Sequence, residues 1–312
     1  MDRRNHTGVT EFIILGLSNG HDSQIILFIS FLIVYLITIT GNLIILTLIT
    51  KDSRLHSPMY FFLANLSTVD LVCVSVTIPK MLDNFLSERK SISFFGCMLQ
   101  MYCFQFLIVV ECYILTAMAY DRYVAICHPL NYPLIMNRRF RVQLVAGCWF
   151  IGFINSVTEA ACIGTLDFCG PNAVDHFFCD VPPLYKLSCS SVFAQEIVFL
   201  VVVSICGIMP LLLVVASYVC IISAILKIRT SEGRRRTFST CASHLIVVTL
   251  YYVSGTYCYM RPYSMYALSE EVKLIAVIYS VINPMLNPII YSLRNKEVIG
   301  AFKTLFLKQR FS

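Results

Sequence analysis

Two acidic side chains lie inside long apolar stretches of the sequence. Asp70 falls in the apolar run 58–80, and Glu111 falls in the run 97–124. Acidic residues within membrane-spanning segments usually face the interior of a helix bundle and mark functional sites. Two carboxyl groups that face one cavity would bind a cation or share a proton, because like charges in close proximity repel each other.

Hard oxygen ligands of this kind favour sodium as the cation. The alternative is that each carboxyl group is neutral and only hydrogen-bonded. The amide and hydroxyl partners for such bonds would be Ser67, Asn42 and Asn287.

A second group of polar residues closes the run 97–124. Asp121, Arg122 and Tyr123 place an acid, a base and an aromatic ring in a row where an apolar segment ends. Charges at the centre of a bilayer are costly, so this position predicts a membrane–water boundary. Asp121 and Arg122 are expected to pair there.

The seventh apolar stretch contains two prolines four residues apart, Pro284 and Pro288. Each proline removes a helix hydrogen bond and weakens the ladder around it. Asn287 can bond a freed carbonyl or reach Asp70. A deformable helix beside buried polar groups suits a switching element, and the alternative is a static kink.

These residues must be positioned by membrane helices. The chain has 312 residues, of which 57% are hydrophobic and 13% charged, whereas soluble domains have roughly 25% charged residues. A spanning helix needs about 20 apolar residues. The sequence therefore predicts an all-α membrane protein, a seven-transmembrane helix bundle with spans at about 25–50, 58–80, 97–124, 142–163, 196–226, 237–260 and 272–293.

The distribution of basic residues predicts the orientation. With residues 1–24 as an extracellular tail, most of the 24 Lys and Arg residues fall on the inner side, as the positive-inside rule requires. Asn5 begins a glycosylation sequon that agrees with this orientation. Residues 294–312 are expected to form a cytoplasmic amphipathic helix and tail on the membrane surface. The basic run 234–236 flanks a membrane helix, which predicts contact with anionic lipid rather than nucleic acid.

The cysteines fit the same orientation. Of 14 cysteines, Cys97, Cys169, Cys179 and Cys189 lie at or beyond the outer boundary, where disulfides form. Four cysteines allow three pairings, and the sequence alone does not choose among them.

An ordered set of motifs resembles the rhodopsin-like (class A) G-protein-coupled receptors and, within them, the olfactory receptors of the tetrapod-type class. The motifs cover nearly the whole chain: GN (41–42), LHSPMYFFLANLS (55–67) with Asp70, MAYDRYVAIC (118–127), SY (217–218), FSTCASH (238–244) and PMLNPIIYSLRN (284–295).

The resemblance implies roles for residues at both ends of the bundle. It implies that Cys97 pairs with Cys179 and Cys169 with Cys189. Arg122 would hold the inactive state through Asp121, then meet the G protein when the sixth segment swings out. Further switch residues implied by these motifs are Tyr123, Tyr218, His244, Asn287, Pro288 and Tyr291. Asp70 and Glu111 would form the sodium-linked site, and no other cofactor is implied.

A ligand that enters from outside should lie in the outer half of the bundle, where inward-facing positions recur at helical spacing. The expected ring is Phe104, Gln105, Ile108, Val109, Cys112, Val202, Cys206, Tyr252, Gly255, Thr256, Tyr259, Val277 and Ser280. Tyr252 is the candidate rotamer switch beneath the ligand, and Asn155, Ser156 and Glu159 could add polarity. This lining favours a small, neutral, largely apolar ligand held mainly by burial.

The expected function is an odorant receptor in the plasma membrane, not an enzyme, that activates a stimulatory, olfactory-type heterotrimeric G protein and raises cyclic AMP. One alternative is a non-olfactory small-molecule receptor of the same class. The other is a small transporter with Asp70 and Glu111 in its ion path, although transporters commonly contain internal repeats and none is evident.

Overall fold

The computed structural model describes residues 9–17, 21–169, 172–260, 270–293 and 296–307. Within these residues, seven helical segments are long and apolar enough to cross a membrane. They are α1 (His21–Lys51), α2 (Pro58–Leu86), α3 (Phe94–Cys127), α5 (Arg138–Gly164), α7–η2–α8 (Phe193–Val203, Ser204–Ile208, Met209–Leu226), α9 (Ser231–Tyr259) and α10–η4–α11 (Glu270–Val277, Ile278–Ile282, Asn283–Leu293).

Most of these helices run further than the apolar spans expected from hydropathy. In α3 and α5 the start of the helix is set by a polar cap rather than by the edge of the hydrocarbon layer. Ser93 Oγ accepts from the backbone N–H of Gly96 at the start of α3, at 3.1 Å. Asn137 Oδ1 accepts from the backbone N–H of Phe140 at the start of α5, at 3.0 Å. Such caps satisfy the first N–H groups of a helix, so the helix can begin in water.

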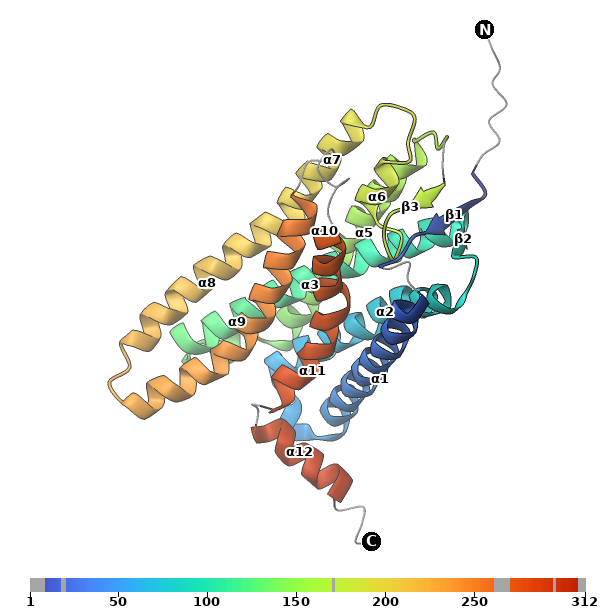
Figure 1. Ribbon diagram of the computed structural model, residues 1–312. Coiled ribbons are helices and arrows are strands. Elements are labelled where there is room, and N and C mark those ends of the chain that lie inside the picture. The colour runs from blue at the N-terminus through green and yellow to red at the C-terminus, as the bar shows by residue number, and fades with distance from the viewer. Residues whose placement is uncertain (1–8, 18–20, 170–171, 261–269, 294–295, 308–312) are drawn as a thin grey trace.

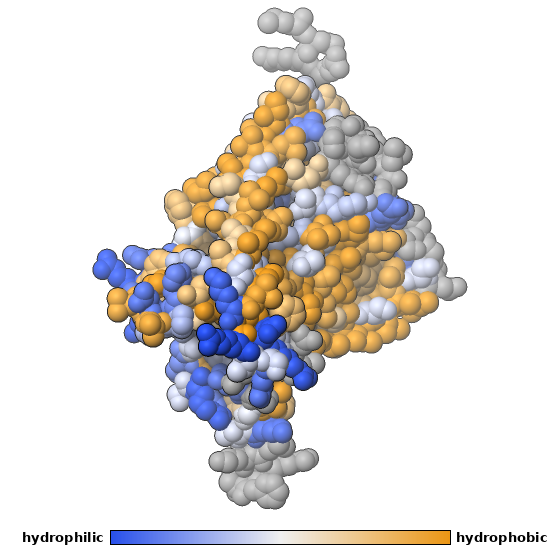
Figure 2. Space-filling view, turned by 90° about the vertical axis from the view of Figure 1, so that its left-hand side faces the viewer, coloured by the Kyte–Doolittle hydropathy of each residue, from blue (hydrophilic) through white to orange (hydrophobic). Residues whose placement is uncertain are grey.

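Helix α3 lies at the centre of the bundle and contacts α2, α5 and α8 (Figure 1). The contact with α5 is especially close at Gly152, where a Cβ atom would lie 2.6 Å from Cγ2 of Val110. The first described strand, β1 (Glu11–Ile14), and the last helix, α12 (Lys296–Leu307), lie at opposite ends of the bundle (Figure 1). Figure 2 shows hydrophobic residues over much of the bundle's flank and hydrophilic residues gathered toward the end that carries the C-terminus.

The end of the bundle nearer the N-terminus carries a small three-stranded sheet that the all-α prediction did not include. Strand β1 (Glu11–Ile14) pairs antiparallel with β2 (Ser91–Ser93) and parallel with β3 (Ala173–Val174). Phe12 and Ile14 are buried beneath it. Part of the expected extracellular tail is therefore ordered onto the bundle, whereas Asn5 lies outside the described residues. Strands of two to four residues, paired across long sequence separations, leave no usable periodicity.

Among the described residues, three short helices connect the long ones: η1 (Ser53–Leu55), α4 (Tyr132–Ile135) and α6 (Val181–Tyr185). The amphipathic helix expected after the seventh span is α12 (Lys296–Leu307), and its described part buries Val298 and Ala301. Tyr60 Oη on α2 donates to Glu297 of α12 at 2.7 Å, which fixes the start of α12 against the bundle.

Candidate ligand cavity and switch region

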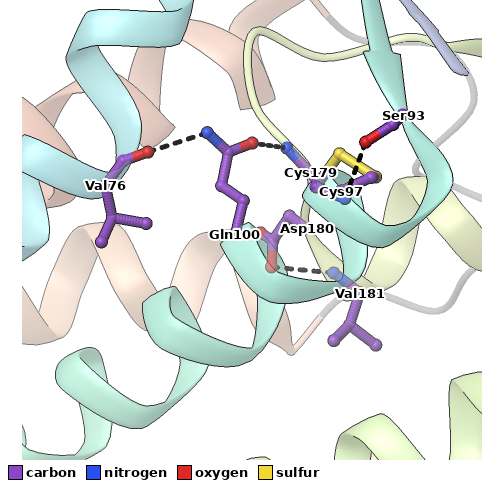
Figure 3. The surroundings of a disulfide bond; sticks show 8 residues. Val76, Ser93, Cys97, Gln100, Cys179, Asp180 and Val181 are labelled. Atoms are coloured by element: carbon purple, nitrogen blue, oxygen red, sulfur yellow. Dashed lines mark hydrogen bonds between the residues drawn. A yellow bond between two sulfur atoms is a disulfide. The ribbon is translucent and has the colours of Figure 1, made fainter.

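The loop between α5 and α7 is fastened to the first turn of α3. Cys97 is bonded to Cys179, with Cα atoms 5.4 Å apart, and Cys169 is bonded to Cys189, with Cα atoms 5.8 Å apart. Both expected pairings are therefore confirmed. Gln100 reinforces the first, because its amide nitrogen donates to the Val76 carbonyl and its amide oxygen accepts from the Cys179 N–H, both at 2.9 Å (Figure 3).

The residue after that disulfide, Asp180, lies next to a cavity, because it bonds two residues of the cavity lining, Gln105 and Tyr259. Its carboxylate accepts hydrogen bonds from Gln105 Nε2, Tyr259 Oη and the Val181 N–H, each at 2.8 Å. Burial raises the pKa of Asp180 to about 6, while these hydrogen bonds act in the opposite direction. The sequence analysis missed Asp180, because nothing local distinguishes a buried loop acid from an exposed one.

The cavity beside Asp180 brings together most of the expected ligand ring. Ten expected residues line it: Gln105, Ile108, Val109, Cys112, Val202, Cys206, Tyr252, Gly255, Thr256 and Tyr259. The lining also includes Asn155 and Glu159, which the sequence suggested only as added polarity. Residues that the sequence analysis missed are Phe199, Val203, Gly207, Ile208, Tyr251, Met260 and Tyr279.

Three expected residues do not line the cavity. Phe104 is buried under the loop between α5 and α7, with its ring 4.5 Å from that of Phe178. Ser280 donates to the carbonyl of Ala276 at 2.7 Å, and Val277 directly precedes the π-helical turn η4. A π-helical turn inserts an extra residue and rotates the helix faces on either side of it, so Tyr279 faces the cavity where regular spacing predicted its neighbours.

A second π-helical turn, η2, widens the fifth span beside the cavity. The Met209 N–H bonds back to Ser204, and Pro210 has no N–H to donate. The carbonyls freed in this way are used by α3. Cys112 Sγ donates to the carbonyl oxygen of Cys206 at 3.1 Å, and Tyr113 Oη donates to the carbonyl oxygen of Ile205 at 3.2 Å.

Two tyrosines of α9 form the base of the cavity. Tyr252 Oη lies 3.2 Å from the Cys112 carbonyl oxygen and 3.0 Å from Thr116 Oγ1. Tyr251 Oη donates to the carbonyl of Ile108. The proposed rotamer switch therefore joins α9 to α3 directly below the cavity.

A buried polar cluster lies deeper in the bundle and contains both intramembrane acids. Asn287 Nδ2 donates to Asp70 Oδ2 at 2.9 Å, and Asn283 Nδ2 donates to Glu111 Oε1 at 3.3 Å. Among the described residues, Asp70 Oδ1 and the amide oxygens of Asn42, Asn283 and Asn287 have no hydrogen-bond partner. These buried oxygens are the hard donors that a cation such as sodium takes.

Helix α1 contacts both prolines of the seventh span. Pro288 leaves the carbonyl of Pro284 without its helical donor, and Asn42 Nδ2 donates to that carbonyl at 3.2 Å. Gly41 permits this approach, because a Cβ there would lie 2.9 Å from the Pro288 ring. Of the two contacts expected for Asn287, the structure has the one to Asp70.

The expected ion pair between Asp121 and Arg122 is absent, although the structure describes both residues. Tyr132 Oη donates to Asp121 at 2.8 Å, and Arg122 Nη2 lies 3.0 Å from Met59 Sδ. Neighbouring residues on a helix point in different directions, so an adjacent acid and base do not face each other. Burial, together with Asp121, raises the pKa of Tyr132, which keeps its phenol protonated as a donor.

His244 links α9 to two other helices. Its Nε2 lies 3.0 Å from the carbonyl oxygen of Leu115 on α3, which can only accept. Its Nδ1 therefore accepts from Tyr218 Oη on α8, at 2.8 Å. Tyr123 Oη lies 3.1 Å from His128 Nε2, and Tyr291 is buried with no partner for its hydroxyl among the described residues.

A seven-helix membrane bundle with a cavity, a disulfide-anchored loop and a polar core is the architecture of a G-protein-coupled receptor. The family model of the olfactory receptors matches residues 31–309. The chain belongs to the olfactory receptor family, whose members bind odorants and couple to G proteins rather than act as enzymes.

Individual olfactory receptors are similar to this chain over nearly their whole length. Olfactory receptor 5F1 of Homo sapiens is 48% identical over 313 residues, covering 100% of this chain and 99% of that protein. Olfactory receptor 3A10 of Mus musculus is 45% identical over 307 residues, covering 98% and 97%. Olfactory receptor 5AR1 of Mus musculus is 46% identical over 312 residues, covering 99% of each. This membership decides against the transporter alternative.

Proposed function

We propose that the cavity beside Asp180 binds a small, mostly apolar volatile ligand. Binding there would activate a stimulatory, olfactory-type G protein and raise cyclic AMP. The observation that carries the proposal is the cavity itself, which holds about 690 Å³ of space between atoms, including its opening. Because that figure includes the opening, the enclosed part is smaller and suits a small ligand.

The route from ligand to G protein would run through α9. Tyr252 contacts α3 directly under the cavity, and His244 contacts α3 and α8 two turns further in. A ligand that favours a different Tyr252 position would bias the equilibrium between closed and open arrangements of α9. Loss of the His244 contacts would then free the inner end of α9 and expose Arg122 to the G protein.

The test is an odorant panel applied to cells that express the receptor, with cyclic AMP as the readout. Arg122→Ala is expected to abolish the ligand-evoked rise while leaving surface level near that of the parent. Arg139→Ala is the matched control, because Arg139 is a basic, exposed residue at the same end of the bundle. Full-size responses in Arg122→Ala would contradict the proposed coupling.

We also propose that the polar cluster around Asp70 and Glu111 binds an allosteric sodium ion. The support is the set of buried oxygens without partners in the described part of the chain. Asp70→Asn keeps the shape and removes the charge, so basal signalling should lose its dependence on sodium concentration. A sodium dependence equal to the parent's would refute the ion site.

The proposed orientation places the N-terminus outside the plasma membrane and the C-terminus in the cytoplasm. The support is the location of both disulfides at the N-terminal end of the bundle, since disulfides form outside the cytosol. An epitope before Glu11 should be stained on intact cells, whereas an epitope after α12 should require permeabilisation. The reverse staining pattern would refute the orientation.

A further inference from the structure

One wall of the cavity carries two polar side chains that the receptor itself leaves unsatisfied. Asn155 and Glu159 lie on α5 and line the cavity, with 5% and 1% of their surfaces exposed. Neither carboxyl oxygen of Glu159 has a hydrogen-bond partner within the described residues, and the same holds for Nδ2 of Asn155. Buried polar groups without partners are unfavourable and uncommon, so each one requires an explanation.

The surroundings of Glu159 do not supply that partner. The ionised group that acts on Glu159 is another acid, Asp180, which repels it. Asp180 is already satisfied by Gln105, Tyr259 and a backbone N–H. The ion pairs found among the described residues do not include Glu159. Gln105 and Tyr259 of the cavity lining are thus satisfied by Asp180, whereas Glu159 and Asn155 have the atoms without partners named above.

The two side chains are placed to act on a single ligand atom. Residues four apart on a helix have Cβ atoms about 5–6 Å apart on the same face. Glu159 offers oxygens that accept, and Asn155 offers an N–H that donates. Around them, Val109, Val202 and Phe199 provide an apolar surface for a carbon skeleton.

We propose that Glu159 and Asn155 together recognise a hydroxyl group, so that the receptor's preferred ligands are small apolar alcohols or phenols. A hydroxyl donates one hydrogen bond and accepts others. It can donate to Glu159 and accept from Asn155 at the same time. An ammonium group can only donate and leaves Asn155 without an acceptor. A carbonyl group can only accept and leaves at least one Glu159 oxygen without a donor. This inference rests on the proposed function, in which the cavity holds the odorant.

The test uses sets of compounds that share one carbon skeleton and differ in one group. Each set contains an alcohol, the matching aldehyde, the primary amine and the hydrocarbon, built on linear octyl, benzyl and cyclohexylmethyl skeletons. Cyclic AMP responses of the parent receptor give the half-maximal concentration for each compound. For skeletons that activate the receptor, the alcohol is expected to be at least about tenfold more potent than the other members of its set. One hydrogen bond to a charged or polar partner provides a difference of this size.

Three substitutions and one control locate the effect. Glu159→Leu and Asn155→Leu should each remove the alcohol preference while retaining responses to the hydrocarbon skeleton. Glu159→Gln keeps an acceptor and should retain part of the preference. Thr158→Val is the control, because Thr158 lies on the same helix, is half-buried, does not line the cavity and bonds its own helix backbone at Ile154.

Surface level provides a readout that needs no ligand. Replacing a buried polar group that has no partner by a same-sized apolar one is neutral or stabilising, so Glu159→Leu should reach the surface at least as well as the parent. A clear fall would mean that Glu159 has a structural role and would overturn the proposal. An unchanged alcohol preference in both leucine variants, or an amine more potent than its alcohol, would also overturn it and leave the odorant-receptor function intact. No response to a full odorant panel by receptor present at the surface would overturn the proposed function itself.

Discussion

Gly152 provides a direct test of how α3 and α5 pack, because the two helices approach most closely there. In Gly152→Ala, the new Cβ would lie 2.6 Å from Val110 Cγ2 and 2.9 Å from the carbonyl oxygen of Phe106. Ordinary van der Waals contact begins near 3.4 Å, so the helices must separate by roughly 0.5–0.8 Å or distort locally. The backbone oxygen of Phe106 cannot rotate away as a side chain can.

The expected loss of stability follows from two opposing terms. Overpacking of this kind costs about 1–3 kcal/mol. Alanine is the better helix former by about 1 kcal/mol, which offsets part of that cost. The net expectation is a loss of up to about 2 kcal/mol. Gly147→Ala is the matched control, because Gly147 lies on the same helix and a Cβ added there would have nothing within 4 Å.

The assay is the apparent Tm of detergent-solubilised receptor, together with surface level in cells. Gly152→Ala should lower the apparent Tm by a few degrees and reduce surface level, whereas Gly147→Ala should leave both unchanged or slightly higher. Because Val109 and Glu159 face the cavity from these two helices, Gly152→Ala should also shift odorant potency. Equal behaviour of the two alanine variants would refute the close packing of α3 on α5.

Three further outcomes are expected. Burial raises the pKa of Asp180 from 3.8 to about 6, so its contribution of about 3 kcal/mol to stability is fully present below pH 4 and is lost as the pH rises through 6. The apparent Tm of solubilised receptor should therefore fall between pH 4 and pH 6, and Asp180→Asn should remove this pH dependence. His176 stays neutral in this window, because burial lowers its pKa to about 3. Cys97→Ser should abolish surface delivery, since losing a native disulfide typically costs about 2–5 kcal/mol, and normal staining would argue against that structural role. Tyr60→Phe should loosen α12, seen as faster proteolysis after permeabilisation; an unchanged cleavage rate would mean that the bond to Glu297 contributes nothing measurable.

The seven spans could be predicted because each depends on local composition alone. A long apolar segment must form a helix in a bilayer, whatever lies around it. The faces of regular helices could be predicted too, which is why Gln105, Val109 and Cys112 on α3 all line the cavity. The disulfide pairing came from resemblance, since the cysteine positions alone left three choices open.

The errors arose where the backbone departs from regular geometry or where distant segments meet. The π-helical turn at Ile278–Ile282 shifted the face of the seventh span, whereas the expected fifth-span residues Val202 and Cys206 do line the cavity. Asp180 bonds Gln105 and Tyr259 of the cavity lining from a loop that the Cys97–Cys179 disulfide ties to α3. The pairing of Asp121 with Arg122 was expected from charge alone, and the directions of adjacent helical side chains oppose it.

The three-stranded sheet has a consequence for biogenesis in the proposed orientation. Strand β1 precedes all seven membrane spans, yet its partner β3 is synthesised only after the first four of them. Until then Phe12, which is buried in the finished receptor, lacks part of its apolar cover, because its contact with Phe168 also forms only after four spans. Closure of the sheet is therefore a late step that reports on correct insertion of half the chain, and the exposed strand is a segment that lumenal chaperones can recognise in receptors that fail to reach it.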